Sequence, residues 1–106
     1  MTITVKSLAD GQLGTSKATL YACPGGAKAI VCVTYVNTDS SNRAVNMYMK
    51  RSGSSSRRVI PEALTLEANG GTCIRWLRGL SAGDVIEGDA SATSAVDYFI
   101  QGIEDA

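Results

Sequence analysis

The chain has 106 residues, of which 44% are hydrophobic and 19% are charged. A chain of this length and composition supports one hydrophobic core, so we expect residues 1–106 to form a single globular domain. Ten basic residues balance ten acidic ones, which disfavours nucleic acid as the main partner because phosphate-binding proteins are usually basic. The balanced charge also favours self-association, since little electrostatic repulsion opposes it.

The sequence carries no signal for secretion, membrane insertion or a cofactor. The N-terminal stretch MTITVKSLADGQLG has no apolar run behind its lysine, and nowhere do 18 apolar residues follow one another. We therefore expect no signal peptide, no transmembrane helix and no membrane partner. The chain has no histidine, which disfavours catalysis and zinc binding. We expect Cys23, Cys32 and Cys73 to be reduced, mostly buried thiols, and we expect no metal and no cofactor.

The first half of the chain alternates with a period of two. Residues 17–23 (KATLYAC) are predicted to form a strand, and so are residues 27–37 (AKAIVCVTYVN). Pro24, Gly25 and Gly26 between them are a strong turn signal, so we predict a hairpin. Both faces of residues 27–37 are fairly apolar. This indicates a central strand that is buried on both sides, or on one side with the other side at an interface.

The second half continues as short strands separated by turn signals. Pro61 favours a sheet edge or a connection, and Asn69-Gly70 indicates a turn. The predicted strands are residues 44–50, 72–77, 85–89 and 95–103, and the predicted loops and turns are residues 38–43, 51–58 and 78–84.

Roughly seven or eight strands at intervals of about 8–12 residues are typical of a β-sandwich or barrel. The sequence therefore predicts an all-β fold, a single antiparallel β-sandwich of about seven or eight strands. A jelly roll is favoured over an immunoglobulin-like key because the Cys…Trp…Cys arrangement of the latter is missing. The strand connectivity is left open.

Acidic residues gather near the C-terminus, at Asp84, Glu87, Asp89 and Asp97. Glu87 and Asp89 are two residues apart on a predicted strand, so they point to the same side, as a catalytic pair or a calcium site requires. The sequence lacks the calcium-loop pattern of EF-hand proteins. The favoured interpretation is that Asp84 caps its own turn, and that Glu87 and Asp89 are edge charges that discourage strand pairing. We therefore predict no catalytic residues.

Arg51, Arg57 and Arg58 flank the serine-rich segment Ser52 to Ser56, and Arg43 lies at the far end of the same predicted hairpin. Arginine suits contact with an acidic partner because its planar guanidinium forms paired hydrogen bonds with carboxylates. A solvated loop is the alternative interpretation, and the absence of interleaved aromatic residues disfavours nucleic acid. The predicted protein-interface residues are Arg43, Arg51, Arg57, Arg58, Tyr35 and Tyr48.

Trp76 shares a predicted strand face with Ile74. This pairing favours a core position for Trp76 over an exposed platform that binds carbohydrate.

Three segments carry a resemblance to a known group of proteins: LADGQLGTSKATLYACPGG, VNTDSSNRAVNMYM and LSAGDVIEGDASATSAVDYFIQGIED. With them the chain resembles small structural proteins of the virions of tailed bacteriophages. The stretches CPGGAKAIVC and TCIRWLRGL depart from the shared pattern. The resemblance implies a β-sandwich subunit on a capsid, neck or tail that acts as a decoration (cement) or accessory protein, and it supplies no catalytic residues.

The resemblance also implies partners and a location. The expected partners are other copies of the chain, with a trimer favoured, and major capsid or tail proteins. The expected location is the virion, after assembly in the host cytoplasm. Residues 1–5 (MTITV) are expected to add as a strand to a neighbouring subunit. The alternative function is a carbohydrate- or host-surface-binding β-sandwich module, and an enzyme based on Glu87 and Asp89 is the least favoured.

Overall fold

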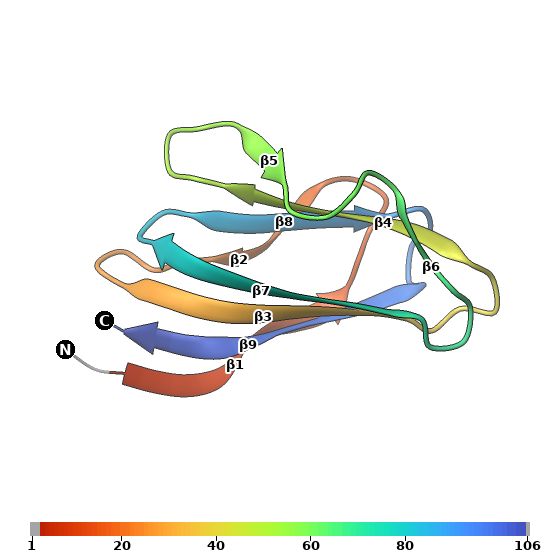
Figure 1. Cartoon of the computed structure of the whole chain (residues 1–106), viewed down its shortest axis with the longest axis horizontal. Coiled ribbons are helices and arrows are strands. Elements are labelled where there is room, and N and C mark those ends of the chain that lie inside the picture. The colour runs from red at the N-terminus through yellow and green to blue at the C-terminus, as the bar shows by residue number, and fades with distance from the viewer. Residues whose placement is uncertain (1–2, 106) are drawn as a thin grey trace.

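A computed structural model describes residues 3–105, with side chains from Ser7 onward. In this part of the chain nine β-strands form two sheets (Figure 1). The strands are β1 (Ile3–Gln12), β2 (Ala18–Ala22), β3 (Lys28–Asn37), β4 (Arg43–Lys50), β5 (Ser56–Arg58), β6 (Leu64–Leu66), β7 (Thr72–Ser81), β8 (Val85–Ala90) and β9 (Val96–Asp105).

The two sheets pack face to face, and all of their strand pairs are antiparallel. Sheet I has the order β1-β9-β3-β7, and sheet II has the order β2-β8-β4-β5, with β6 also paired to β4. Most successive strands change sheet, and the last strand returns beside the first. If β5 and β6 are counted as one interrupted strand, this is the connectivity of a jelly roll. The predicted antiparallel β-sandwich is confirmed.

The core lies between the sheets and follows from strand alternation. On β3, Ala29, Val31, Val33 and Tyr35 are at most 4% exposed. The Tyr35 hydroxyl donates to the carbonyl oxygen of Asn46 across the core at 3.0 Å. A Cβ at Gly88 would lie 2.2 Å from that hydroxyl oxygen, so the sandwich requires glycine where Tyr35 crosses it.

The predicted hairpin around Pro24 to Gly26 is wrong. Strand β2 pairs with β8 in sheet II, whereas β3 pairs with β7 and β9 in sheet I. The turn is therefore an arch between the two sheets. A turn signal specifies a reversal of the chain, but it does not specify whether the flanking strands join one ladder. A bulge between Thr19 and Tyr21 places Leu20 and Tyr21 both in the core, which strict alternation does not predict.

Three other boundaries differ from the prediction. Ile3 to Val5, which were expected to add as a strand to a neighbouring subunit, pair with β9 of their own chain, as part of a strand that extends to Gln12. Met1 and Thr2 lie outside the described residues. The predicted turn at residues 78–84 is mostly strand, because β7 continues through a bulge at Gly79, whose φ is 76°. The predicted loop 51–58 ends in β5. Within residues 3–105 there is no helix of the length and apolar character needed to cross a membrane.

Candidate subunit interface

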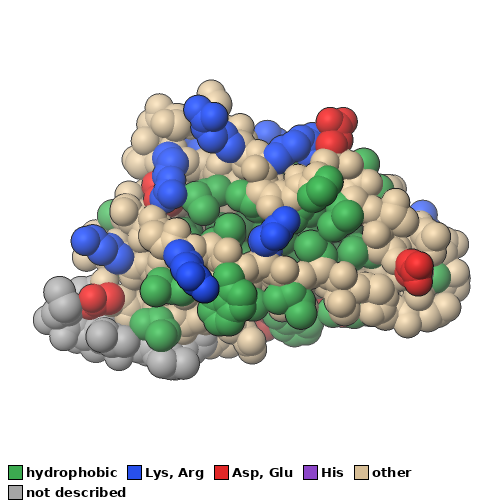
Figure 2. All heavy atoms as spheres, viewed as in Figure 1, with side chains coloured by type: hydrophobic (Ala, Val, Ile, Leu, Met, Phe, Trp, Pro, Cys, Tyr) green, Lys and Arg blue, Asp and Glu red, His purple; other side chains and the backbone are tan. Residues whose placement is uncertain are grey.

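The outer face of sheet I exposes large apolar side chains. We call this surface the open face. Figure 2 shows hydrophobic side chains gathered over this part of the molecule and bordered by Lys and Arg side chains. Soluble monomers rarely expose contiguous apolar patches larger than about 300–600 Å². The large apolar side chains are Ile30 (44% exposed), Ile74 (59%), Trp76 (59%), Phe99 (43%) and Ile103 (38%).

The strand register makes this patch continuous across three strands. Trp76 on β7 lies opposite Cys32 on β3, and Cys32 lies opposite Gln101 on β9. One step along the strands, Ile74, Thr34 and Phe99 form the next row. Side chains that lie directly opposite one another in an antiparallel ladder point to the same side. The apolar side chains are therefore neighbours and not scattered single residues.

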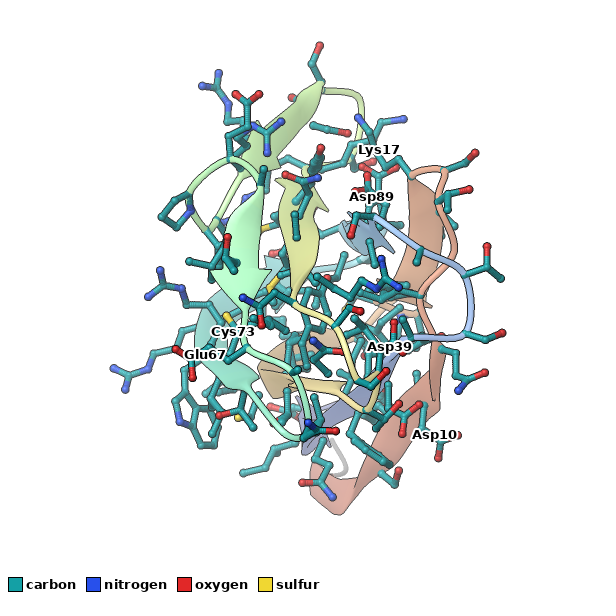
Figure 3. All side chains as sticks on the ribbon, turned by 90° about the vertical axis from the view of Figure 1, so that its right-hand side faces the viewer. Asp10, Lys17, Asp39, Glu67, Cys73 and Asp89 are labelled. Atoms are coloured by element: carbon teal, nitrogen blue, oxygen red, sulfur yellow. The ribbon has the colours of Figure 1, made fainter. Side chains whose placement is uncertain are left out.

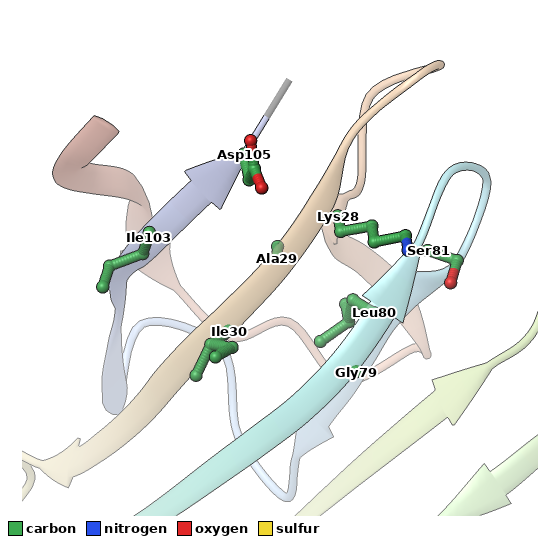
Figure 4. A pocket seen from close by; sticks show the side chains of 8 residues that line it. All are labelled: Lys28, Ala29, Ile30, Gly79, Leu80, Ser81, Ile103 and Asp105. Carbon is green, nitrogen blue, oxygen red and sulfur yellow. The ribbon is translucent and has the colours of Figure 1, made fainter. Parts of the chain in front are cut away.

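Two hollows mark the described part of the open face. One, with a volume of about 330 Å³, is lined by Ile30, Cys32, Trp76, Gln101, Gly102 and Ile103. The other, of about 570 Å³, lies where the bulge between Ala29 and Val31 interrupts the β3–β7 ladder. Figure 4 shows its lining, with Lys28 extending from β3 toward Ser81 on β7, away from Asp105 on β9. Apolar side chains predominate in both hollows, so both suit apolar groups of a partner.

Charged residues lie at the border of the open face. Arg78 is exposed two residues beyond Trp76 on the edge strand β7. Asp10 is exposed on the other edge strand, β1, opposite Phe99. Lys28 and Asp105 lie opposite each other in the β3–β9 ladder. The open face thus has an apolar centre and charged margins, which is the usual composition of a protein interface.

The outer face of sheet II, which we call the closed face, has the opposite character. The Asn46 side-chain amide donates to Asp89 at 2.7 Å, and its oxygen accepts from Arg58 at 2.6 Å and from the Ala63 backbone at 2.9 Å. The Lys17 ammonium and the Arg58 guanidinium both lie over the Tyr48 ring, at 4.4 Å and 4.9 Å from its centroid. The polar groups of this face therefore find partners within the subunit.

The predicted interface residues lie away from the open face. Tyr35 is fully buried in the core, so no partner can reach it in the folded subunit. Tyr48 is 8% exposed beneath its two cations. Arg57 and Arg58 are exposed on β5. The interface role of these four residues stays a prediction, and the exposed side chains among them are those of Arg57 and Arg58.

The other two predicted arginines form contacts within the subunit. Arg43 pairs with Asp39 at 2.5 Å on the surface. Arg51 pairs with Asp84 at 2.7 Å and donates to the Gly79 carbonyl oxygen at 2.8 Å. Arg51 therefore joins the β4–β5 loop to the β7–β8 turn.

Asp84 caps its turn, as predicted. Its carboxylate accepts the backbone N–H of Ser81 at 2.9 Å and that of Ser52 at 3.0 Å. The hydrogen bond from Ser81, with those from Arg51 and Ser52, holds the pKa of Asp84 below its usual range although the carboxyl group is buried. Asp84 is therefore a structural anion.

Glu87 and Asp89 point to the same side, as predicted, but the interpretation as edge charges is wrong. Their strand β8 is paired on both sides, with β2 and with β4. Ser56 donates to Glu87, and Asn46 donates to Asp89. Figure 3 shows Asp89 and Lys17 at one end of the view, with Asp10 beside β1 at the opposite end. The acidic pair therefore belongs to the closed face.

The predicted core position of Trp76 is also wrong. Trp76 and Ile74 do share a face, but that face points outward. Leu77 and Cys73 fill the inner side of β7 instead. The strand pattern groups residues by face, and it does not tell which of two apolar faces meets the core. The predicted interface residues therefore do not include Trp76, Ile74 or the other large apolar side chains of the open face.

The cysteines are free thiols, as expected, and they are less buried than expected. Cys23 is buried, whereas Cys32 and Cys73 are half-buried. Burial raises the pKa of Cys23 and of Cys73. Within residues 3–105 no three His, Cys, Asp or Glu side chains lie close enough together to hold a metal ion.

Comparison with known proteins gives information on the fold. No protein-family model matches the chain, and no curated protein matches it. One similar solved structure has a TM-score of 0.60 with this chain. Its description reads "Bacillus endospore appendages form a novel family of disulfide-linked pili". The two chains are 19% identical over 97% of this chain and 87% of the other. This similarity shows that the β-sandwich is shared.

Proposed function

We propose that the protein is a structural subunit that binds neighbouring subunits in a larger assembly through its open face. The observation that carries this proposal is the 59% exposure of Trp76 within an apolar patch that extends over three strands. Covering apolar surface is favourable by roughly 25 cal/mol per Å². Tryptophan is also enriched among the residues that dominate binding energy. Exposing such an apolar patch to water costs free energy, and a partner that covers the patch removes this cost.

The similar solved structure supports an assembly role, because its description concerns pili. The finer proposal is a particle of a tailed bacteriophage, and its support is the sequence resemblance described above. In that setting the subunit is a decoration (cement) or accessory protein bound to capsid or tail proteins in the virion, after assembly in the host cytoplasm. The proposed role is not catalytic, since Glu87 and Asp89 serve the closed face.

The test compares the wild-type chain with a variant that removes the two most exposed large apolar side chains of the open face. We expect the wild type to form oligomers in sedimentation velocity and the double variant Ile74→Ser, Trp76→Ser to be monomeric. The control is Lys50→Ser, a change at an exposed residue of β4 on the closed face, which is expected to keep the wild-type distribution. For the virion role, the wild type is expected to co-purify with phage particles. A wild-type protein that stays monomeric and never co-purifies with particles contradicts the proposal.

A second candidate function, carbohydrate binding, is favoured by the position of Trp76 beside the smaller hollow and near Gln101. An exposed tryptophan stacks on sugar rings, and Gln101 supplies hydrogen bonds. Apolar side chains predominate around it, which fits a protein partner better. Glycan-array binding that Trp76→Ala abolishes would establish this candidate, and an array without binding removes it.

A further inference from the structure

The partner of the open face can be inferred from its size and from the position of its charges. We propose that a second copy of the chain covers the open face, related by a two-fold axis that places Arg78 of each copy against Asp10 of the other. This inference rests on the proposed function, because it assumes that the open face is an interface.

The size of the face fits one half of a stable interface. Sheet I has four strands, each ten residues long. With a strand spacing of about 4.8 Å and a rise of about 3.3 Å per residue, its projected area is roughly 600 Å². A standard stable interface buries about 800 Å² on each partner. A rough surface exposes more area than its projection, so the whole face approaches the size of one half of a standard interface. Two such faces that cross at an angle cover only their central parts, which gives an interface at the small end of the range for specific complexes.

The charges lie at opposite corners of the face. Arg78 is on the β7 edge, toward the end where Lys28 and Ser81 pair. Asp10 is on the β1 edge, toward the end where Gln12 and Asp97 pair. The apolar residues lie between these corners. Lys28 and Asp105 occupy opposite positions of the β3–β9 ladder at the Arg78 end of the face and together add no net charge there. This leaves Arg78 at one corner and Asp10, with Asp97 beside it, at the other.

A second copy satisfies both corners at once. The two-fold axis lies between the two packed faces and runs at right angles to the line from Arg78 to Asp10. Rotation about this axis brings the basic corner of one copy against the acidic corner of the other. An isologous interface then makes the same contact twice. The strands of the two sheets cross at close to a right angle, which is one of the two common arrangements of packed sheets.

The same operation brings apolar residues together. Trp76 of one copy comes over the region of Phe99 of the other, where the two rings form an aromatic pair. Cys32 lies on β3 near the centre of the face, opposite Trp76 and Gln101. A residue near a two-fold axis comes close to its own copy. The arrangement therefore predicts that the thiols of Cys32 from the two copies are near each other.

Charge reversal tests the pairing of Arg78 with Asp10. In Arg78→Glu alone, and in Asp10→Arg alone, like charges meet twice, and we expect the dissociation constant of the dimer to rise about tenfold or more. An equimolar mixture of the two variants restores opposite charges at both contacts, so heterodimers of near wild-type affinity are expected. Lys50→Glu, a reversal at an exposed residue of β4 on the closed face, is the matched control and is expected to leave the dissociation constant unchanged. A mixture that binds no more tightly than either variant alone overturns the proposal.

Cross-linking gives a readout that does not depend on charge. A short bismaleimide is expected to link two wild-type chains through Cys32, with the product lost in Cys32→Ser and kept in Cys73→Ser. Absence of a Cys32-dependent dimer contradicts the arrangement. If Ile74→Ser with Trp76→Ser abolishes assembly while mixing and cross-linking both fail, the orientation is wrong and the proposed function stands. If the apolar double variant assembles like the wild type, both are wrong.

Discussion

The two outer faces of the sandwich are built by the same strand alternation and have opposite characters. On the closed face, Asn46 and Asp89 bond to each other, and Ser56 donates to Glu87. On the open face, Ile74 and Trp76 are each 59% exposed. The closed face is completed when the chain folds, whereas the open face still has apolar area to bury.

Two aromatic residues show what produces the difference. Tyr48 on the closed face is only 8% exposed because Lys17 and Arg58 lie over its ring. Trp76 on the open face lies in a row with Cys32 and Gln101, which are shorter than lysine and arginine and leave the indole uncovered. Long cationic side chains thus cover aromatic surface within a subunit, and their absence over Trp76 leaves that surface to a partner.

The largest expected effect on folding comes from opening the closed face at Tyr48. Tyr48→Ala removes a buried ring and both cation contacts, so we expect the free energy of unfolding to fall by about 3 kcal/mol. Trp76→Ala on the open face is expected to change the unfolding of the monomer by less than about 1 kcal/mol. Urea denaturation at low protein concentration measures both. Equal losses for the two variants would remove the distinction between the faces.

A smaller loss is expected at Asn46. Asn46→Ala leaves Asp89, Arg58 and the Ala63 N–H without their shared partner, at a cost of about 1–3 kcal/mol. Assembly is expected to be unchanged, because the closed face is not the interface. A variant that unfolds like the wild type but fails to assemble would show that Asn46 serves a partner, and the assignment of the two faces would then be reversed.

The sequence reveals the parts of the fold that depend on neighbouring residues, and it does not reveal the parts that depend on pairing between distant segments. Alternation and turn residues identify most strands, since both act within a few residues. They do not show that β2 and β3 belong to different sheets, because that depends on ladders with β8 and β9, far away in the chain. Strand β1 was missed for the same reason: it is held by β9.

The candidate site was harder to predict than the fold. Residues 27–37 correctly indicated a strand with two apolar faces, and in the single chain the second face is left at the surface, with Ile30 44% exposed. Trp76 was assigned to the core because its pairing with Ile74 is compatible with either side of a sheet. Nothing near Asn46 marks its role, since its partners Arg58, Ala63 and Asp89 come from other segments.

The smallest expected effect is a dependence on pH at the end of the sandwich where Asp84 joins the turn to the β4–β5 loop. Its pKa is lower in the folded chain than the value of about 3.9 for an unfolded aspartate. Its contribution to stability is therefore present above about pH 4 and is lost as the pH falls through the lower folded-state value. Asp84→Asn is expected to flatten this acid loss in denaturation curves. An unchanged acid profile in Asp84→Asn would contradict the assignment.

The most direct test of the central claim is sedimentation equilibrium of the wild type beside Ile74→Ser with Trp76→Ser. The open face predicts a reversible oligomer for the wild type and a dissociation constant at least about 100-fold higher for the variant, which corresponds to the loss of roughly 2.7 kcal/mol of binding free energy. The variant is expected to keep the unfolding free energy of the wild-type monomer. Equal dissociation constants for the two proteins would contradict the claim that this face holds the assembly together.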